Sequence, residues 1–429
     1  MTLSTEKILE GLDPEQCEAV TAIRGPVCVI AGAGTGKTRV ITHRIAYAVA
    51  SGVTDPTKTL ALTFTARAAG EMRARLRQLG VPNASARTFH SAALKQLMFF
   101  WPHSLGGQFP KLLTTKAPLL ATSISNTDTY LTQGPQTLRD ISSEIEWAKA
   151  MEVPPHLYVD EAIAQSRSLL LPNGKSNKEN LAEIAKVYEQ YEAIKKAERI
   201  IDFEDVLLLT VGMLEEDRAV RERVRDQYRY FTVDEYQDVS PLQQRLLNLW
   251  LGNREEICVV GDAAQTIYSF AGASSTFLLS FTKRFPEAKV IRLSRGYRST
   301  PEIIRAANKV LRSSTSQTNH HELVSMNESG EQFTVKRFEN AALEAREVVE
   351  AIADLIASVG EAEIAILART NNQLDLFASE LARLGIPAQV KNSDRFFERV
   401  DVRDAMKVIR QASVLPSDDW YRDLESVLK

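Results

Sequence analysis

A glycine-rich loop at residues 31–38, with the sequence AGAGTGKT, constrains this chain more than any other feature. It follows an apolar run at 27–30 and precedes a helix-like segment at 39–50, which is the order of a phosphate-binding loop. Glycine lets backbone N–H groups turn inward, and the N-terminus of the following helix favours an anion. Lys37 is placed to reach the terminal phosphates of a nucleotide, and the Thr38 hydroxyl to hold Mg²⁺. An ordinary glycine-rich turn is the alternative.

Composition is that of an ordinary globular protein, with 44% apolar and 25% charged residues among 429. At about 150 residues per domain, this length corresponds to roughly three domains. No apolar run is long enough to span a membrane, and the N-terminus lacks the apolar core of a secretory signal. Cys17, Cys28 and Cys258 are widely spaced, which disfavours a zinc site or disulfides and fits a reducing cytoplasm. A net charge of −3 means that any nucleic-acid contact must come from a local groove.

The first hundred residues alternate between predicted strands and helices. The strands are 27–30, 59–64 and 84–89, and the helices are 39–50, 66–78 and 91–99. Such alternation predicts an α/β fold, with a parallel sheet covered by helices on both faces. The pattern resumes with strands at 231–233 and 257–260. Residues 1–109 and 201–286 are therefore predicted to form one sheet domain.

Residues 110–200 interrupt this domain as a predicted helical insert. Apolar residues at helical spacing predict helices at 142–150 and 180–198, and the polar stretch 114–138 is expected to be irregular. The charges at 183–199 are interpreted as a solvated helix face.

A second α/β domain is expected at 287–429. Its predicted strands are 290–293, 334–338, 364–367 and 388–390, and its predicted helices are 344–358 and 374–384.

The segment VDEYQD at 233–238 carries the second strong signal. A strand that ends in two carboxylates completes the metal site of many P-loop enzymes. Asp234 is the candidate Mg²⁺ ligand, and Glu235 is the candidate base for the attacking water. Alone, this pair could equally be a surface acidic turn, but the phosphate loop upstream favours a hydrolytic site.

These two segments resemble the corresponding motifs of the UvrD/Rep/PcrA-type helicases of superfamily one, most of all the actinobacterial UvrD-like branch. Further matches follow in the family's order: 12–16 (LDPEQ), 63–69 (TFTARAA), 88–91 (TFHS), 202–205 (DFED), 260–270 (VGDAAQTIYSF), 293–299 (LSRGYRS), 364–370 (IAILART) and 396–399 (FFER). The resemblance implies P-loop (RecA-like) domains and an ATP-dependent DNA helicase that moves 3′ to 5′ on single-stranded DNA in repair or replication.

The resemblance also implies roles in the nucleotide site. Gln16 would read adenine, Tyr297 would stack on it, and Arg39 would cover its other face. The loop residues implied to bind ATP are Ala33, Gly34, Thr35, Gly36, Lys37 and Thr38. Gln265 would sense the γ-phosphate, and Arg298 would act as an arginine finger. Asp262 would either support the metal–water network or cap a turn.

The implied DNA contacts are aromatic and directed to the backbone. Phe64, Tyr268 and Phe270 would stack on bases, with core packing as the alternative for Phe64 and Phe270. Arg67 and His90 would touch phosphates, although His90 could equally be a buried histidine. The implied partners are single-stranded DNA, junctions between duplex and single strand, and unidentified repair proteins, with no membrane.

The chain departs from the family pattern at four places. Ala31 replaces the first glycine of the loop, Gly296 replaces an asparagine, and Ala271 replaces an arginine that holds DNA in many relatives. The chain also ends at Lys429, before the family's last two motifs. The second domain is therefore expected to be incomplete, and unwinding by this chain alone to be weak or absent.

The alternative to a helicase is thus an ATP- and DNA-binding fragment that does not couple hydrolysis to movement. A P-loop kinase or GTPase is disfavoured, because it would leave Gln16, Gln265 and Arg298 without a role.

Overall fold

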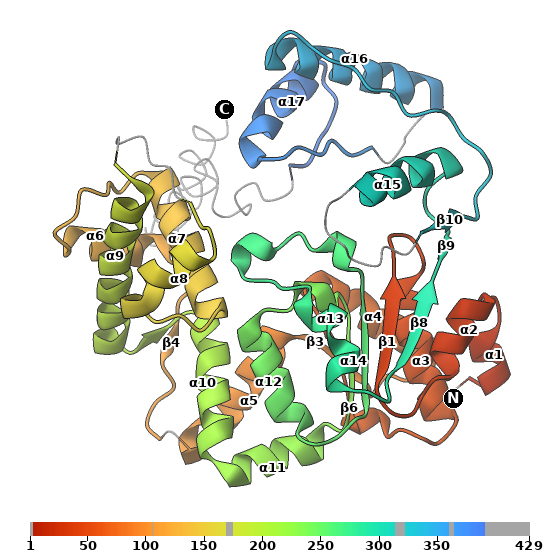
Figure 1. Ribbon diagram of the computed structural model, residues 1–429, viewed down its shortest axis with the longest axis horizontal. Helices are drawn as coiled ribbons and strands as arrows, with labels where there is room; N and C mark the ends of the chain where they lie inside the picture. The colour runs from red at the N-terminus through yellow and green to blue at the C-terminus, as the bar shows by residue number, and fades with distance from the viewer. Residues whose placement is uncertain (1–2, 105, 169–174, 314–321, 360–363, 391–429) are drawn as a thin grey trace, which may run out of the picture. The chain divides into compact units, whose positions relative to one another are not determined.

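The computed structural model describes residues 3–104, 106–168, 175–313, 322–359 and 364–390 (Figure 1). Contacts divide the chain into two units, Met1–Gln332 and Phe333–Lys429, and each is considered by itself. Among the described helices, none has both the length and the apolar character that a membrane span requires.

A six-stranded parallel sheet organises the first unit, in the order β3-β2-β6-β7-β1-β8. The strands are β1 (Val27–Ala31), β2 (Thr59–Thr63), β3 (Ser85–Thr88), β6 (Tyr230–Val233), β7 (Ile257–Gly261) and β8 (Lys289–Leu293). The predicted α/β fold with a parallel sheet is confirmed. Because β1 and β6 are parallel strands of one sheet, the glycine loop and the acidic pair follow them at the same end of the sheet. Strand β7 lies between β1 and β6 and separates the two segments.

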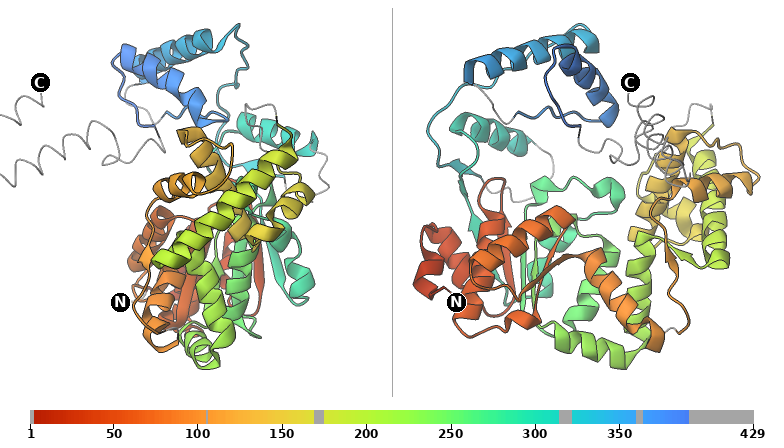
Figure 2. Two further views of the ribbon diagram at one scale, coloured as in Figure 1. Left: turned by 90° about the vertical axis from the view of Figure 1, so that its left-hand side faces the viewer. Right: turned by 180° about the vertical axis from the view of Figure 1, so that it is seen from behind.

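Helices cover both faces of this sheet (Figure 2). Alternate strand residues point to opposite faces, so that Leu60 and Phe231 enter one core, whereas Val29 and Ala61 enter the other. The first core is closed by α5 (Phe89–Ser104), α10 (Phe203–Glu216), α11 (Arg218–Gln227), α12 (Pro241–Leu251), α13 (Thr276–Leu279) and α14 (Phe281–Arg284). The second is closed by α1 (Thr5–Leu9), α2 (Pro14–Thr21), α3 (Lys37–Ala50) and α4 (Ala66–Gln78). Cys28 and Cys258 are buried in these cores, as predicted.

The insert is helical, as predicted, and has its own apolar core. It comprises α6 (Ala117–Ser125), α7 (Pro135–Ala150), α8 (Tyr158–Ala164) and α9 (Asn177–Glu198). The parallel pair β4 (Lys111–Leu112) and β5 (Ile200–Ile201) joins it to the sheet domain. The expectation of an irregular segment at 114–138 is wrong, because Leu119, Leu120 and Ile124 give α6 a buried face despite its polar surroundings.

Strand β8 also differs from expectation. The strand predicted at 290–293 forms, but it pairs with β1 as the edge of the first sheet and does not begin a second one. A short pair, β9 (Arg295–Gly296) with β10 (Val324–Ser325), and helix α15 (Pro301–Ser313) follow it.

In the second unit the described residues form two helices that pack on each other, α16 (Ala341–Val359) and α17 (Asn371–Arg383). The strands predicted at 334–338, 364–367 and 388–390 are not formed, and these residues lack regular secondary structure. A strand needs a neighbour to pair its backbone N–H and C=O groups, and no described residue of this unit supplies one. The motif at 396–399 lies outside the described residues.

Candidate nucleotide and DNA site

The glycine loop connects β1 to α3, and two of its glycines have left-handed backbones. Gly34 has φ of +78° and Gly36 of +87°, a region that side chains disfavour. A Cβ at Gly34 would lie 2.7 Å from the Cβ of Arg298, and one at Gly36 would lie 2.9 Å from Nε2 of Gln16. The loop is therefore in close contact with two residues that the sequence had placed in the nucleotide site.

Lys37 joins the ends of three strands. Its Nζ donates hydrogen bonds to Oε2 of Glu235 at 3.1 Å and to Oε1 of Gln265 at 3.2 Å. Glu235 follows β6 and has φ of 50°, a left-handed conformation that costs a non-glycine residue roughly 1–2 kcal/mol. Such strain clusters at functional sites. The three residues converge although about two hundred positions separate Lys37 from the others in the sequence.

Asp234, which directly precedes Glu235, is buried, with 7% of its surface exposed. Burial, with a further contribution from the neighbouring Glu235, raises its pKa to about 7. Its Oδ1 accepts a hydrogen bond from the backbone N–H of Glu235 at 3.0 Å. A cation nearby would favour its charged form. Its carboxylate and the Thr38 hydroxyl are both hard oxygen donors, so the residues present fit Mg²⁺.

Gln16 and Tyr297 lie beside the loop and are held by Asp13 and the loop backbone. Gln16 is buried: its Nε2 donates to the carbonyl of Thr35 at 2.9 Å, and its Oε1 accepts from the Asp13 N–H at 3.3 Å. The Tyr297 hydroxyl donates to Oδ2 of Asp13 at 2.6 Å, and its N–H donates to the carbonyl of Gly34 at 2.9 Å. Tyr297 remains 44% exposed, which leaves its ring open to stacking.

A cavity of about 320 Å³ brings most of the predicted nucleotide residues together. It is lined by Ala33, Gly34, Gly36, Lys37, Thr38, Arg39, Arg75, Glu235, Gln265, Tyr297 and Arg298. The predicted residues Gln16, Thr35 and Asp234 are not among the lining residues. Arg75 was missed, because in the sequence it is one of several arginines on α4 and nothing distinguishes it from a solvated residue.

An aromatic segment begins three residues after Gln265. The rings of Phe64 and Tyr268 stack with centroids 4.8 Å apart and planes at 22°. Phe270 follows, with its centroid 6.1 Å from that of Tyr268 and 57% of its surface exposed. Phe64 follows β2 and the other two follow β7, so the predicted aromatic residues do gather at one place.

The remaining two predicted DNA contacts differ from each other. Arg67, in the first turn of α4, has a side chain that is 90% exposed and forms a surface ion pair with Glu71 at 3.1 Å. His90 is half-buried, and its ring meets the edge of Phe203 at 6.3 Å. Burial, reinforced by Lys116, lowers the pKa of His90 to about 4. The ring is therefore uncharged at neutral pH, which does not favour a phosphate contact, and both roles of His90 stay predictions.

A contact between the insert and the aromatic segment was also missed. Arg167 donates to the carbonyl of Phe270 at 3.0 Å, pairs with Glu144 at 2.6 Å, and stacks over Trp147 at 4.4 Å. It lies more than one hundred positions from Phe270, so no local pattern could reveal the contact.

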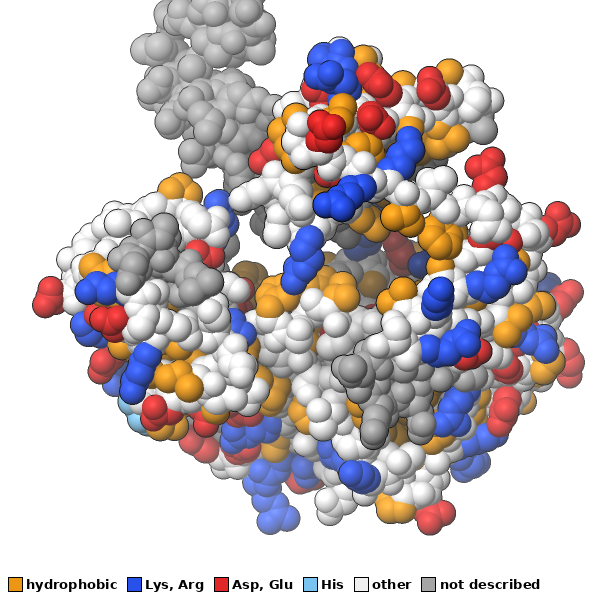
Figure 3. Space-filling model, turned by 45° about the horizontal axis from the view of Figure 1, so that its top comes forward, with side chains coloured by type: hydrophobic (Ala, Val, Ile, Leu, Met, Phe, Trp, Pro, Cys, Tyr) orange, Lys and Arg blue, Asp and Glu red, His pale blue; other side chains and the backbone are white. Residues whose placement is uncertain are grey.

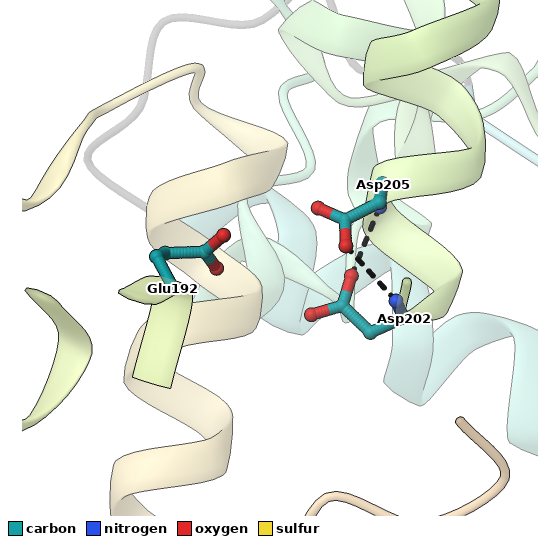
Figure 4. A group of neighbouring side chains, drawn as sticks. All are labelled: Glu192, Asp202 and Asp205. Atoms are coloured by element: carbon teal, nitrogen blue, oxygen red, sulfur yellow. Dashed lines mark hydrogen bonds between the residues drawn. The ribbon is translucent and has the colours of Figure 1, made fainter. Parts of the chain in front are cut away.

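Three carboxylates at the base of the insert could suggest a metal site (Figure 4). Glu192 on α9 and Asp202 and Asp205 at the start of α10 have oxygens within 4.8 Å of one another. Lys149 and Lys195 both enter this group, with nitrogens 2.6–3.1 Å from the acids. Each of the three acids already pairs with both ammonium groups, so we assign an ionic cluster and not a metal site.

Comparison with known proteins gives a consistent result. The UvrD/REP helicase N-terminal domain matches residues 12–286, and the UvrD-like helicase C-terminal domain matches residues 291–414. The chain is 44% identical to the ATP-dependent DNA helicase UvrD2 of Mycobacterium tuberculosis, over 99% of the chain and 61% of that protein. It is 31% identical to the ATP-dependent DNA helicase PcrA of Bacillus subtilis, over 98% of the chain and 55% of that protein.

A third relative is the ATP-dependent DNA helicase UvrD1 of Mycobacterium bovis, 31% identical over 94% of the chain and 53% of that protein. The chain therefore spans between 53% and 61% of the length of these three relatives. The two mycobacterial relatives agree with the resemblance to the actinobacterial branch. The chain belongs to the UvrD/REP helicase family.

Proposed function

We propose that this chain contains the ATP-hydrolysing motor of a DNA helicase that moves 3′ to 5′ along single-stranded DNA. One observation carries the proposal: a single connection after β7 supplies Gln265 to the nucleotide cavity and, three residues later, Tyr268 to the aromatic stack. The motor domain would comprise residues 1–109 and 201–286 together with its edge strand β8, with the insert at 110–200 and a second motor domain in the residues after β8.

Hydrolysis would proceed by in-line attack of water on the γ-phosphate. Glu235 would accept the proton of that water, Lys37 would contact the β- and γ-phosphates, and Arg298 would neutralise charge in the transition state. Because Lys37 pairs with Glu235 in this structure, a bound phosphate would compete for the ammonium group and free the carboxylate. Bound Mg²⁺, held by Thr38 and Asp234, would supply further charge neutralisation on the phosphates.

Adenine recognition would use the exposed ring of Tyr297 on one face and a guanidinium on the other. Arg39 and Arg75 both line the cavity, so either can cover the base or approach a phosphate. The second amide hydrogen of Gln16 is the group that would read the adenine edge.

DNA would be held by local aromatic contacts and not by a broad basic field. On the face drawn in Figure 3, basic and acidic side chains are interspersed, with apolar side chains between them. Stacking on Phe64, Tyr268 and Phe270 suits a motor that must grip any sequence. Arg67 would add a phosphate contact, whereas the surroundings of His90 favour a structural role.

The Lys37→Ala substitution tests the nucleotide site. A hydrogen bond to a charged group contributes about 1.5–3 kcal/mol, so its loss should weaken the binding of ATP roughly 10- to 150-fold. Titration with a fluorescent ATP analogue measures the effect, with Lys95→Ala, an exposed lysine on α5, as the matched control. Equal affinity of Lys37→Ala and the unaltered chain would exclude the phosphate-loop assignment.

The Tyr268→Ala substitution tests the aromatic segment. Base stacking contributes about 1–3 kcal/mol per base, so the affinity for single-stranded DNA should fall roughly 5- to 150-fold. Fluorescence anisotropy with a labelled oligonucleotide measures this, and Phe99→Ala, at a ring that is 69% exposed on α5, serves as the control. If both variants bind DNA as the unaltered chain does, the segment does not contact DNA.

Strand displacement separates the two functions that the sequence left open. Displacement from a duplex with a 3′ single-stranded tail, but not a 5′ tail, supports a 3′-to-5′ helicase. ATP and DNA binding without displacement supports the narrower activity of an ATP- and DNA-binding fragment. Repair or replication, junction binding, protein partners and a cytoplasmic location are further proposals that follow from the resemblance alone.

A further inference from the structure

Gln237 connects the candidate base to the next strand without lining the cavity. It is 1% exposed. Its Nε2 donates to Oε2 of Glu235 at 2.9 Å and to Oδ2 of Asp238 at 3.2 Å. Its Oε1 accepts from the backbone N–H of Asp262 at 3.0 Å, at the end of β7. All three hydrogen bonds depend on the side-chain amide, because its NH₂ group donates hydrogen bonds and its oxygen accepts them.

These bonds close a ring of hydrogen bonds that runs through the backbone of Asp262 and reaches the nucleotide cavity at Lys37, Glu235 and Gln265. Asp262 accepts from Nε2 of Gln265 at 2.8 Å, Gln265 accepts from Lys37 at 3.2 Å, and Lys37 donates to Glu235 at 3.1 Å. Gln237 returns the ring from Glu235 to Asp262. The packing is close, because a Cβ at Gly261 would lie 2.5 Å from Oε1 of Gln237. A displacement of the Glu235 carboxylate must therefore displace the Gln237 side chain or break their hydrogen bond.

Asp238 extends this ring toward the aromatic segment. Its Oδ1 is buried, and no described residue donates a hydrogen bond of standard geometry to it. Burial raises the pKa of Asp238, while the nearby backbone N–H groups of Ile267 and Tyr268 oppose that shift. Gln237 therefore contacts Asp238, and the backbone N–H groups that act on this carboxyl belong to residues of the connection that carries the aromatic rings. The N–H of Ser274 donates to the carbonyl of Val239 at 3.2 Å and fixes the far end of the same connection.

We propose that Gln237 is a positioning residue that, with Asp238, transmits the state of the nucleotide site to the Tyr268–Phe270 segment. The inference rests on the function proposed above. When a phosphate takes Lys37 from Glu235, Gln237 is the remaining hydrogen-bond partner of that carboxylate within the ring. Displacement of Glu235 then shifts Gln237, and with it Asp238 and Asp262, where the connection to the Tyr268–Phe270 segment begins. The aromatic rings that follow are thereby held differently with and without ATP.

The test measures coupling and not activity. The dissociation constant of a labelled single-stranded oligonucleotide is measured with and without a non-hydrolysable ATP analogue and Mg²⁺. We expect the analogue to change this constant on the order of tenfold in the unaltered chain, a usual size for coupled sites. The Gln237→Met substitution keeps the side-chain length but removes all three amide contacts. In this variant we expect the analogue to change the constant by less than about twofold. Both ligands should still bind.

Two further variants make the result specific. Gln244→Met removes another buried glutamine, bonded to Tyr236 at 2.6 Å and Asn248 at 2.7 Å, and should leave the coupling ratio unchanged. Asp238→Asn keeps the shape of the side chain but removes its charge, and it should also lower the ratio of the two dissociation constants. If thermal melting shows that Gln237→Met is unfolded, Asp238→Asn replaces it in the test. Undiminished coupling in a folded Gln237→Met or Asp238→Asn protein overturns the inference. So does a ratio of one in the unaltered chain when both ligands bind. Failure of the unaltered chain to bind ATP or DNA overturns the proposed function itself.

Discussion

The Glu235→Gln variant is expected to bind ATP and to hydrolyse it about 10²- to 10⁴-fold more slowly than the unaltered chain, the usual contribution of a general base. The amide keeps the shape of the carboxylate but cannot take a proton from water. Binding should be retained, because the phosphates are held by the loop and by Lys37, which is freed from its 3.1 Å pair with Glu235. Single-turnover phosphate release measures the chemical step apart from binding.

The matched control is Glu255→Gln. Glu255 is an exposed acid just before β7, at the opposite end of that strand from the site. Its substitution should leave hydrolysis unchanged. A Glu235→Gln rate within tenfold of the unaltered chain would show that another group activates the water.

The largest effect on folding is expected at Lys149. Its side chain is 2% exposed and contacts Asp202 at 2.7 Å, Asp205 at 2.7 Å and Glu192 at 2.8 Å. Removing one partner of a buried ion cluster leaves uncompensated charge and costs about 3–5 kcal/mol. Lys149→Met should therefore lower the free energy of unfolding by about this amount, measured by denaturant titration at neutral pH.

Lys289→Met is the control for this prediction, because Lys289 pairs with Glu18 at 2.9 Å on the surface, where the two side chains are 51% and 53% exposed. Exposed pairs contribute about 0–1 kcal/mol. An equal loss of stability in the two variants would mean that the cluster does not stabilise the join between the insert and α10.

Acid should weaken the same cluster. Burial pushes the pKa of Asp202 upward, but Lys149 and Lys195 outweigh it and hold that pKa well below its usual range. A depressed pKa contributes stability above the unfolded-state value of about 3.9, and this contribution is lost as the pH falls below it. The unaltered chain should therefore lose stability below about pH 4 more steeply than Lys149→Met does.

Features that depend on local chain order were predictable from the sequence. The glycines, Lys37 and Thr38 follow one strand, and Asp234 and Glu235 follow another. Because parallel strands end at a common edge, their convergence follows once the sheet is parallel. The position of β7 between β1 and β6, which brings Gln265 to Lys37, could not be predicted, since strand order depends on long-range packing.

Features made by distant residues were missed or misread. The charges at 183–199 predict a solvated helix face, yet Lys195 is 3% exposed and lies in the cluster with Asp202. Helix periodicity cannot show a partner more than fifty positions away, such as Lys149 for Asp202. The strands expected at 334–338, 364–367 and 388–390 failed for a related reason, because apolar sequence favours a strand only where a neighbour can pair with it.

The direct test of an ATP-driven motor on DNA is the steady-state rate of ATP hydrolysis by this chain, titrated with a single-stranded oligonucleotide. Because Gln265 and Tyr268 lie on one connection after β7, the rate should rise with the oligonucleotide concentration and saturate. Tyr268→Ala should need more oligonucleotide to reach the same rate. A rate of hydrolysis that does not change with the oligonucleotide concentration, under conditions where ATP and DNA are both shown to bind, would contradict the coupling of the two sites.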